Sequence, residues 1–89
     1  MDDHERARIM RLAAGACESA GQDAFGKRLR GLATSPLDEQ LAVLTLLERV
    51  PGLSLPMFRM AALAKKTLTG EPGKRAEFER LTAQITGLE

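Results

Sequence analysis

The sequence contains no tryptophan and no tyrosine, and its only aromatic residues are three phenylalanines among 89 residues. Large aromatic side chains usually dominate the burial of apolar surface in a core. Without them, the core must be built from aliphatic residues and methionine, which bury less area each. A chain of this length also buries only about 60–65 % of its unfolded surface. We therefore predict a single domain over residues 1–89 that gains further burial from a partner or a second copy.

Residues that support redox chemistry and metal binding are also scarce. The single cysteine, Cys17, excludes an intramolecular disulfide, and with one histidine, His4, it falls far short of a metal-ligand set. Cys17 lies among alanines in a predicted helix, where a small buried thiol is the usual finding. We therefore expect no metal at these two residues.

The sequence also contains few residue patterns that are typical of catalytic sites. Adjacent carboxylates occur at Asp38-Glu39 and at Glu77 and Glu79, but these first-turn positions are typical of surface charges that interact with a helix dipole. The eight glycines are scattered and form no phosphate-binding loop. The sequence therefore predicts a protein that is not an enzyme, with no catalytic residues, no cofactor and no small-molecule substrate.

Long apolar runs and an excess of one charge are both absent. No stretch reaches the roughly 20 apolar residues of a membrane span, and residues 50–64, the nearest approach, contain two prolines and Arg59. The first ten residues, MDDHERARIM, place acid before base, unlike a secretory signal. The 13 basic and 12 acidic side chains leave a formal charge of +1, which gives no strong field toward nucleic acid or membranes. We expect a cytoplasmic protein that has no membrane partner.

The clearest element that is present is a helical hairpin. Seven of the ten residues in LAVLTLLERV, 41–50, are apolar, which is typical of a central buried helix. The segment Ser35-Pro36-Leu37-Asp38 predicts its start, with serine as the cap and proline at the first helical position. Pro51-Gly52 ends it, and Ser54 caps the next helix. The sequence therefore predicts a central hairpin of helices at about 36–50 and 54–69.

The remaining patterns complete an all-α fold, a compact bundle of four to five short helices. The first helix begins near Asp2 or Asp3, which favour a helix start. It ends at Gly21, and a second helix follows over about 23–33, so that two separate helices or one bent helix are both open. The last helix, from 74 to 88, spaces its apolar residues at three and four, as in an amphipathic helix: Phe78, Leu81, Ile85 and Leu88.

These exclusions favour a noncatalytic interaction module or accessory subunit that binds a protein partner or a second copy through an apolar helix face. The fourth and fifth predicted helices are the expected site. Methionines at helical spacing beside alanines more often fill gaps in a core, but they also occur at adaptable binding surfaces. The candidate anchors are Met57, Met60, Phe78, Leu81 and Ile85, with Arg59 as a rim contact.

An alternative is a DNA-binding or transcription-regulating protein. Residues 51–70 include three basic residues and no acidic one, and residues 44–64, LTLLERVPGLSLPMFRMAALA, look like the helix-turn-helix of winged-helix regulators such as the MarR family. This resemblance implies that the closing helix takes the place of the recognition helix, although Glu77 and Glu79 at its start oppose phosphates. The candidate phosphate contacts are Lys65, Lys66, Lys74, Arg75 and Arg80.

Overall fold

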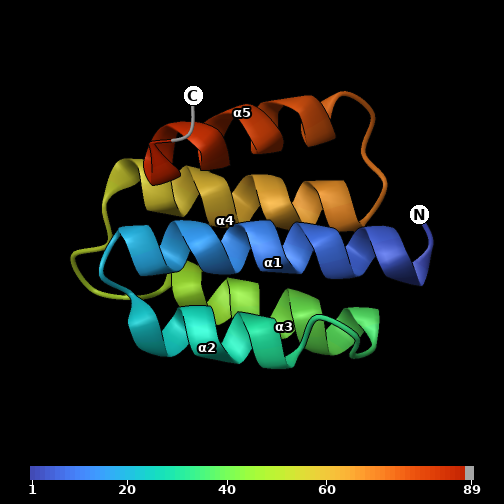
Figure 1. Ribbon diagram of the computed structural model, residues 1–89, viewed down its shortest axis with the longest axis horizontal. Helices are drawn as coiled ribbons and strands as arrows, with labels where there is room; N and C mark the ends of the chain where they lie inside the picture. The colour runs from blue at the N-terminus through green and yellow to red at the C-terminus, as the bar shows by residue number, and fades with distance from the viewer. Residues whose placement is uncertain (88–89) are drawn as a thin grey trace.

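Five helices and no strand make up the computed structural model, which describes residues 1–87 (Figure 1). The predicted all-α fold is confirmed. The first two helices are separate, because the chain turns at Gly21, whose φ of +81° lies in the left-handed region that glycine adopts readily. Leu88, the last residue of the predicted closing stripe, lies outside the described residues. The helices are α1 (Asp3–Ser19), α2 (Asp23–Gly31), α3 (Leu37–Glu48), α4 (Leu55–Leu68) and α5 (Lys74–Thr86).

Helices α1 and α4 form the centre of the bundle. They contact each other, both contact α5, and each has one further neighbour, α2 for α1 and α3 for α4. In Figure 1, α5 lies on one side of this pair, and α2 and α3 lie on the other. Both helices bury alanines, such as Ala13 and Ala64, and such small side chains allow neighbouring helix axes to approach closely. No helix within residues 1–87 has the length and hydropathy needed to cross a membrane.

The predicted hairpin is present as α3 and α4, but its two helices are buried to different extents. Seven residues of α4 are buried, whereas α3 buries four, and Leu46 on α3 remains 45 % exposed. The apolar composition of 41–50 therefore overstates the burial of α3. The physical reason is position, because α3 lies at the edge of the bundle, where its main neighbours are α4 and α2.

Two of the predicted helix caps are confirmed. The Asp2 carboxylate accepts a hydrogen bond from the Glu5 N–H at 2.8 Å at the start of α1. The Ser54 hydroxyl accepts one from the Met57 N–H at 3.4 Å at the start of α4. Both caps satisfy backbone donors that the first helical turn leaves without partners.

The predicted serine cap of α3 is wrong. The helix begins at Leu37, and Pro36 occupies the cap position with an extended ψ of 152° and no side-chain hydrogen bond. Its carbonyl oxygen accepts the N–H groups of Glu39 and Gln40 at 3.1 and 3.2 Å. Because Pro36 is extended rather than helical, Ser35 lies one residue too early to cap the first turn.

Helix α2 packs closely on α1 at Gly26, a residue that its own helix propensity disfavours. A Cβ atom at Gly26 would lie 2.8 Å from Cγ of Glu18 and 3.1 Å from the carbonyl oxygen of Ala14. The Arg30 guanidinium donates two hydrogen bonds to the Glu18 carboxylate, at 2.9 and 2.6 Å, and this pairing lowers the pKa of Glu18. The missing side chain of Gly26 therefore permits the contact between the two helices.

Substituting Gly26→Ala is expected to lower the free energy of unfolding by about 1 kcal/mol, because the cost of moving Glu18 and the α1 backbone exceeds the gain in helix propensity. Gly15→Ala, inside α1, is the matched control, since an added Cβ meets no atom within 4 Å there. It is expected to raise stability by about 0.5–1 kcal/mol. Urea denaturation of both variants checks the pair. Equal stability gains would show that Gly26 is not a close-contact position.

Candidate protein-binding surface

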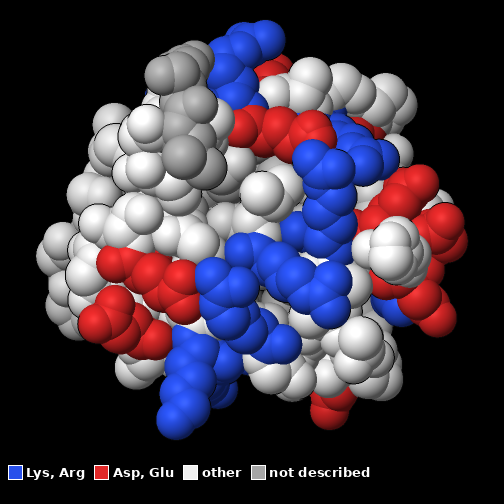
Figure 2. Space-filling view, in the orientation of Figure 1, with Lys and Arg blue, Asp and Glu red and all other residues white. Residues whose placement is uncertain are grey.

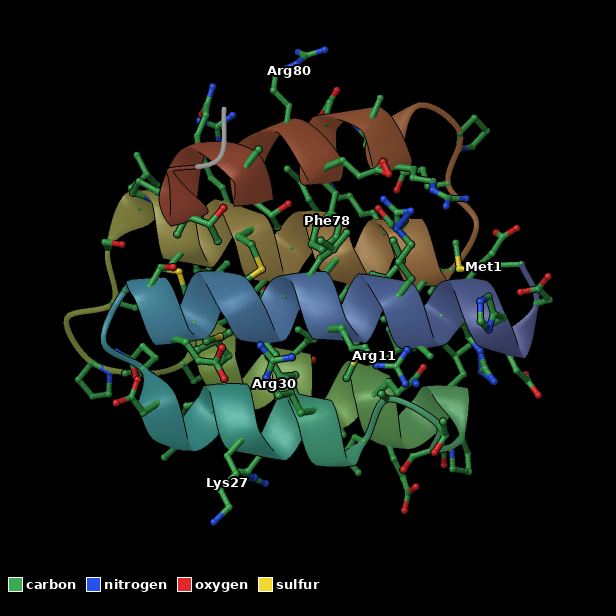
Figure 3. The ribbon with its side chains drawn as sticks, in the orientation of Figure 1. Met1, Arg11, Lys27, Arg30, Phe78 and Arg80 are labelled. Atoms are coloured by element: carbon green, nitrogen blue, oxygen red, sulfur yellow. The ribbon has the colours of Figure 1, made fainter. Side chains whose placement is uncertain are left out.

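Most of the predicted apolar anchors lie in the core. Met57, Met60 and Phe78 are at most 2 % exposed, and Leu81 is also buried. Figure 3 shows Phe78 between α5 and the α1–α4 pair, and Ile85 is half-buried against the same core. These side chains attach α4 and α5 to the bundle, and the four buried ones, Met57, Met60, Phe78 and Leu81, are not available on its surface. The spacing identified apolar stripes correctly, but the stripes face inward, because α4 is central and the buried side chains of α5 pack on the same core.

The outward side of α4 carries a different apolar set. Leu55 is 68 % exposed and Phe58 is 44 % exposed, and with the half-buried Ala62 they follow a spacing of three and four that places them on one side of the helix. We call these three residues the α4 ridge. The other exposed large apolar residues within 1–87 are Met1 and Leu46, which lie on different elements.

A sequence signal for the α4 ridge does exist. At 100° per residue, a core stripe through Met57, Met60, Ala61 and Ala64 leaves Leu55, Phe58 and Ala62 on the other side of the helix. The pattern therefore contained two apolar faces. Which of the two faces belongs to the core became clear only from the neighbours of α4 in the structure.

A groove runs beside the α4 ridge, between α4 and α5. It consists of two adjoining cavities of about 450 and 220 Å³ that share Arg59, Leu63 and Glu77 in their walls. Phe58 and Ala62 of the ridge form part of one cavity wall. We call this feature the α4/α5 groove, and its charged residues are Arg59, Lys66, Lys74, Glu77 and Arg80.

The α4/α5 groove is basic. Glu77 is its single carboxylate, and one of its oxygens lies 3.7 Å from Nζ of Lys74. Within residues 1–87, Arg59, Lys66 and Arg80 take part in no ion pair. Arg80 extends from α5 away from the bundle (Figure 3). Three cations of this groove are therefore open to a carboxylate from another molecule.

A second groove, of about 450 Å³, separates α3 from α4. Its wall includes a partly buried ion pair between Lys65 and Glu48. Lys65 Nζ also donates a hydrogen bond to Oγ1 of Thr45 at 3.2 Å. This network links α3 to α4 and engages the Lys65 ammonium within the protein, which leaves Lys65 poorly placed to bind a phosphate.

The five predicted phosphate contacts do not form one patch. Lys66, Lys74 and Arg80 line the α4/α5 groove, whereas Lys65 faces α3. Arg75 points toward α1, where its guanidinium lies 3.1 Å from Glu5 and 3.8 Å from Glu79. Figure 2 shows the basic side chains on the viewed face lying beside acidic ones. The structure therefore divides this set among three surfaces.

The packing of the last three helices also differs from a helix-turn-helix. In that motif the two helices cross at about 90–120°. Here α3, α4 and α5 lie alongside their neighbours, each extended roughly along the longest axis of the molecule (Figure 1). The helix-turn-helix arrangement implied by residues 44–64 is therefore not present among the helices that the structure describes.

The single thiol of the chain, that of Cys17, is buried. Cys17 is fully buried on α1, as predicted, and burial raises the pKa of its thiol to about 11. The thiol is therefore protonated at neutral pH and weakly nucleophilic. Within residues 1–87, no group of three or more His, Cys, Asp and Glu side chains is placed to hold a metal ion.

In comparisons with known proteins, no family model, no curated protein and no solved structure matched this chain. The α4 ridge and the adjacent groove are therefore the features on which a functional proposal rests.

Proposed function

We propose that this protein is a noncatalytic helical interaction module of the cytoplasm that binds a protein partner through the α4 ridge. The observation that supports the proposal is the pair of exposed side chains, Leu55 and Phe58, on a helix whose opposite face is the core. Isolated exposed apolar residues are ordinary on protein surfaces. Two adjacent ones beside a groove offer a continuous contact. Full burial of such a side chain is worth about 1.5–3 kcal/mol, and a partner gains the share that the exposed part of each represents.

The helix that carries the ridge is anchored in the core. Seven residues of α4 are buried, and Ser54 caps its first turn next to Leu55. A partner therefore loses little binding free energy to the ordering of this helix, which is the usual benefit of a preorganised surface. The small size of the ridge favours a modest affinity dominated by a few side chains, with Phe58 as the main anchor.

The proposal can be tested by photo-crosslinking in extract of the source cells. A crosslinking residue is placed at position 58 or, as a control, at position 46, because Phe58 and Leu46 are 44 % and 45 % exposed. We expect one or more proteins to crosslink from position 58 and not from position 46. Each is then purified for binding measurements, and light scattering of the protein alone shows whether the partner is a second copy.

The purified partner is titrated against three proteins. The double variant Leu55→Ser/Phe58→Ser is expected to bind at least about tenfold more weakly than the wild type, a loss of about 1.4 kcal/mol. Leu46→Ser is expected to bind like the wild type, and circular dichroism confirms that both variants remain folded. Equal binding by the double variant, or an equal loss with Leu46→Ser, would show that the α4 ridge is not the docking surface.

A further inference from the structure

We infer that the partner presents an acidic amphipathic helix, whose apolar side packs on the α4 ridge while its carboxylates lie over the α4/α5 groove. This inference rests on the proposed function and adds the chemistry of the partner. It follows from the placement of apolar and basic side chains next to each other on two packed helices.

The charge of the α4/α5 groove favours an acidic partner. Four cations and one carboxylate line the groove, and residues 51–70, which include all of α4, contribute no acid of their own. Arginine presents several donors that suit a carboxylate geometrically, so Arg59 and Arg80 are the strongest contacts expected. An uncharged partner would leave these guanidinium groups without a counterion when it covers them, which costs binding free energy.

The order of the residues along α4 favours a helix as the element that the partner presents. Phe58 and Ala62 share a cavity wall with Arg59 and Lys66, so that the apolar row and the basic row run side by side along α4. Across the groove on α5, Lys74 and Arg80 lie on either side of Glu77 in the sequence and add two further cations to its wall. A helix with an apolar stripe and acidic residues along one flank matches both rows, which is the helix-in-groove mode of recognition.

A second copy of this chain fits less well. If the α4 ridge packed against itself, Arg59 and Lys66 of one copy would approach the corresponding cations of the other, and like charges oppose association. The same surface also suits a nucleic acid poorly. The exposed Leu55 and Phe58 are apolar and would form no favourable contact with phosphates. The Glu77 carboxylate within the groove would repel them.

A membrane surface is disfavoured for another reason. Helices that lie on membranes present a broad apolar face to lipid. In α4 the broad apolar face is buried in the core, and only the narrow ridge remains outside.

The test is a selection on the full-length protein with a library of displayed amphipathic peptides. All members carry Leu, Ile, Phe or Met at helical spacing, and their flanking positions are randomised between Glu and Lys. We expect the bound pool to be enriched in Glu by about tenfold over Lys at positions on one flank, an enrichment that falls as salt rises. A chosen acidic peptide should bind at least about tenfold more tightly than its Lys counterpart.

Charge reversal provides the matched control. Arg59→Glu/Lys66→Glu is expected to abolish or reverse the preference for Glu. Arg11→Glu/Lys27→Glu makes the same change in net charge at exposed residues on α1 and α2 (Figure 3) and is expected to leave the preference unchanged. A pool without charge preference, or an equal effect of the two charge reversals, overturns the inference. Tighter binding to a DNA duplex, to vesicles containing phosphatidylserine or to a second copy overturns it as well.

The same selection separates this inference from the proposed function. If Leu55→Ser/Phe58→Ser leaves the recovery of peptides unchanged, or if the wild type recovers none, docking on the α4 ridge fails and the inference fails with it. If recovery depends on Leu55 and Phe58 but the flanks show no preference, the docking surface stands and only the acidic character of the partner is rejected.

Discussion

Replacing Phe78 with alanine is expected to lower the free energy of unfolding by about 3–5 kcal/mol, the usual cost of truncating a fully buried aromatic residue. Phe78 is 0 % exposed, whereas Phe25 is half-buried and Phe58 is exposed, so it is the largest side chain in the core. It is also one of only three buried residues on α5, with Leu81 and Thr82. The loss should therefore weaken the attachment of α5 to α1 and α4. Urea denaturation followed by circular dichroism measures the change.

Phe58→Ala is the matched control, because it makes the same chemical change at an exposed site on α4. It is expected to change the free energy of unfolding by less than about 1 kcal/mol. The two variants also separate folding from binding, since Phe58→Ala should reduce partner binding in a fully folded protein. Comparable losses of stability in both variants would contradict the assignment of Phe78 to the core and Phe58 to the surface.

Replacing Gln40 with leucine is expected to lower the free energy of unfolding by about 2 kcal/mol, because it leaves a buried carbonyl without a donor at nearly constant side-chain volume. Gln40 is fully buried on α3. Its Nε2 donates hydrogen bonds to the carbonyl oxygens of Leu32 and Ala33 at 3.0 and 3.1 Å. These carbonyls lie just past the end of α2, where a helix has no further N–H groups of its own to offer.

Two further features of the Gln40 site reduce the expected loss of stability. The Leu32 carbonyl also accepts the Ser35 N–H at 3.1 Å, so the Ala33 carbonyl is the more affected group. Oε1 of Gln40 has no hydrogen-bond partner among residues 1–87. Removing this buried, unpaired oxygen stabilises the variant and offsets part of the loss. Gln84→Leu, at an exposed glutamine on α5, is the control and is expected to change stability by less than about 0.5 kcal/mol. Chemical denaturation of both variants decides the matter, and an unaltered stability for Gln40→Leu would show that these hydrogen bonds contribute nothing.

The candidate site was only partly predictable from the sequence. The sequence indicated α4 and α5 as the interacting elements, and Arg59, Lys66, Lys74 and Arg80 do line a groove between them. It assigned the anchoring role to Met57 and its neighbours, which are buried. Helical periodicity identifies which residues share a face, but it does not determine which of two apolar faces is covered, since that depends on how many helices pack around the element.

By itself, the sequence determined that the chain folds into four to five helices, where the hairpin falls and that Ser54 caps α4. It could do so because caps, turns and periodicity act over a few residues. It left open whether the first two helices are separate and whether Asp2 or Asp3 caps α1. Only the tertiary structure decided that α1 and α4 form the centre and that Gly26 is a point of close contact. It also decided that Gln40 donates hydrogen bonds to carbonyls at the end of α2, and that Phe58 rather than Met57 is exposed. Each of these outcomes depends on groups distant in sequence, because burial, hydrogen-bond satisfaction and charge pairing are fixed only when the helices pack together.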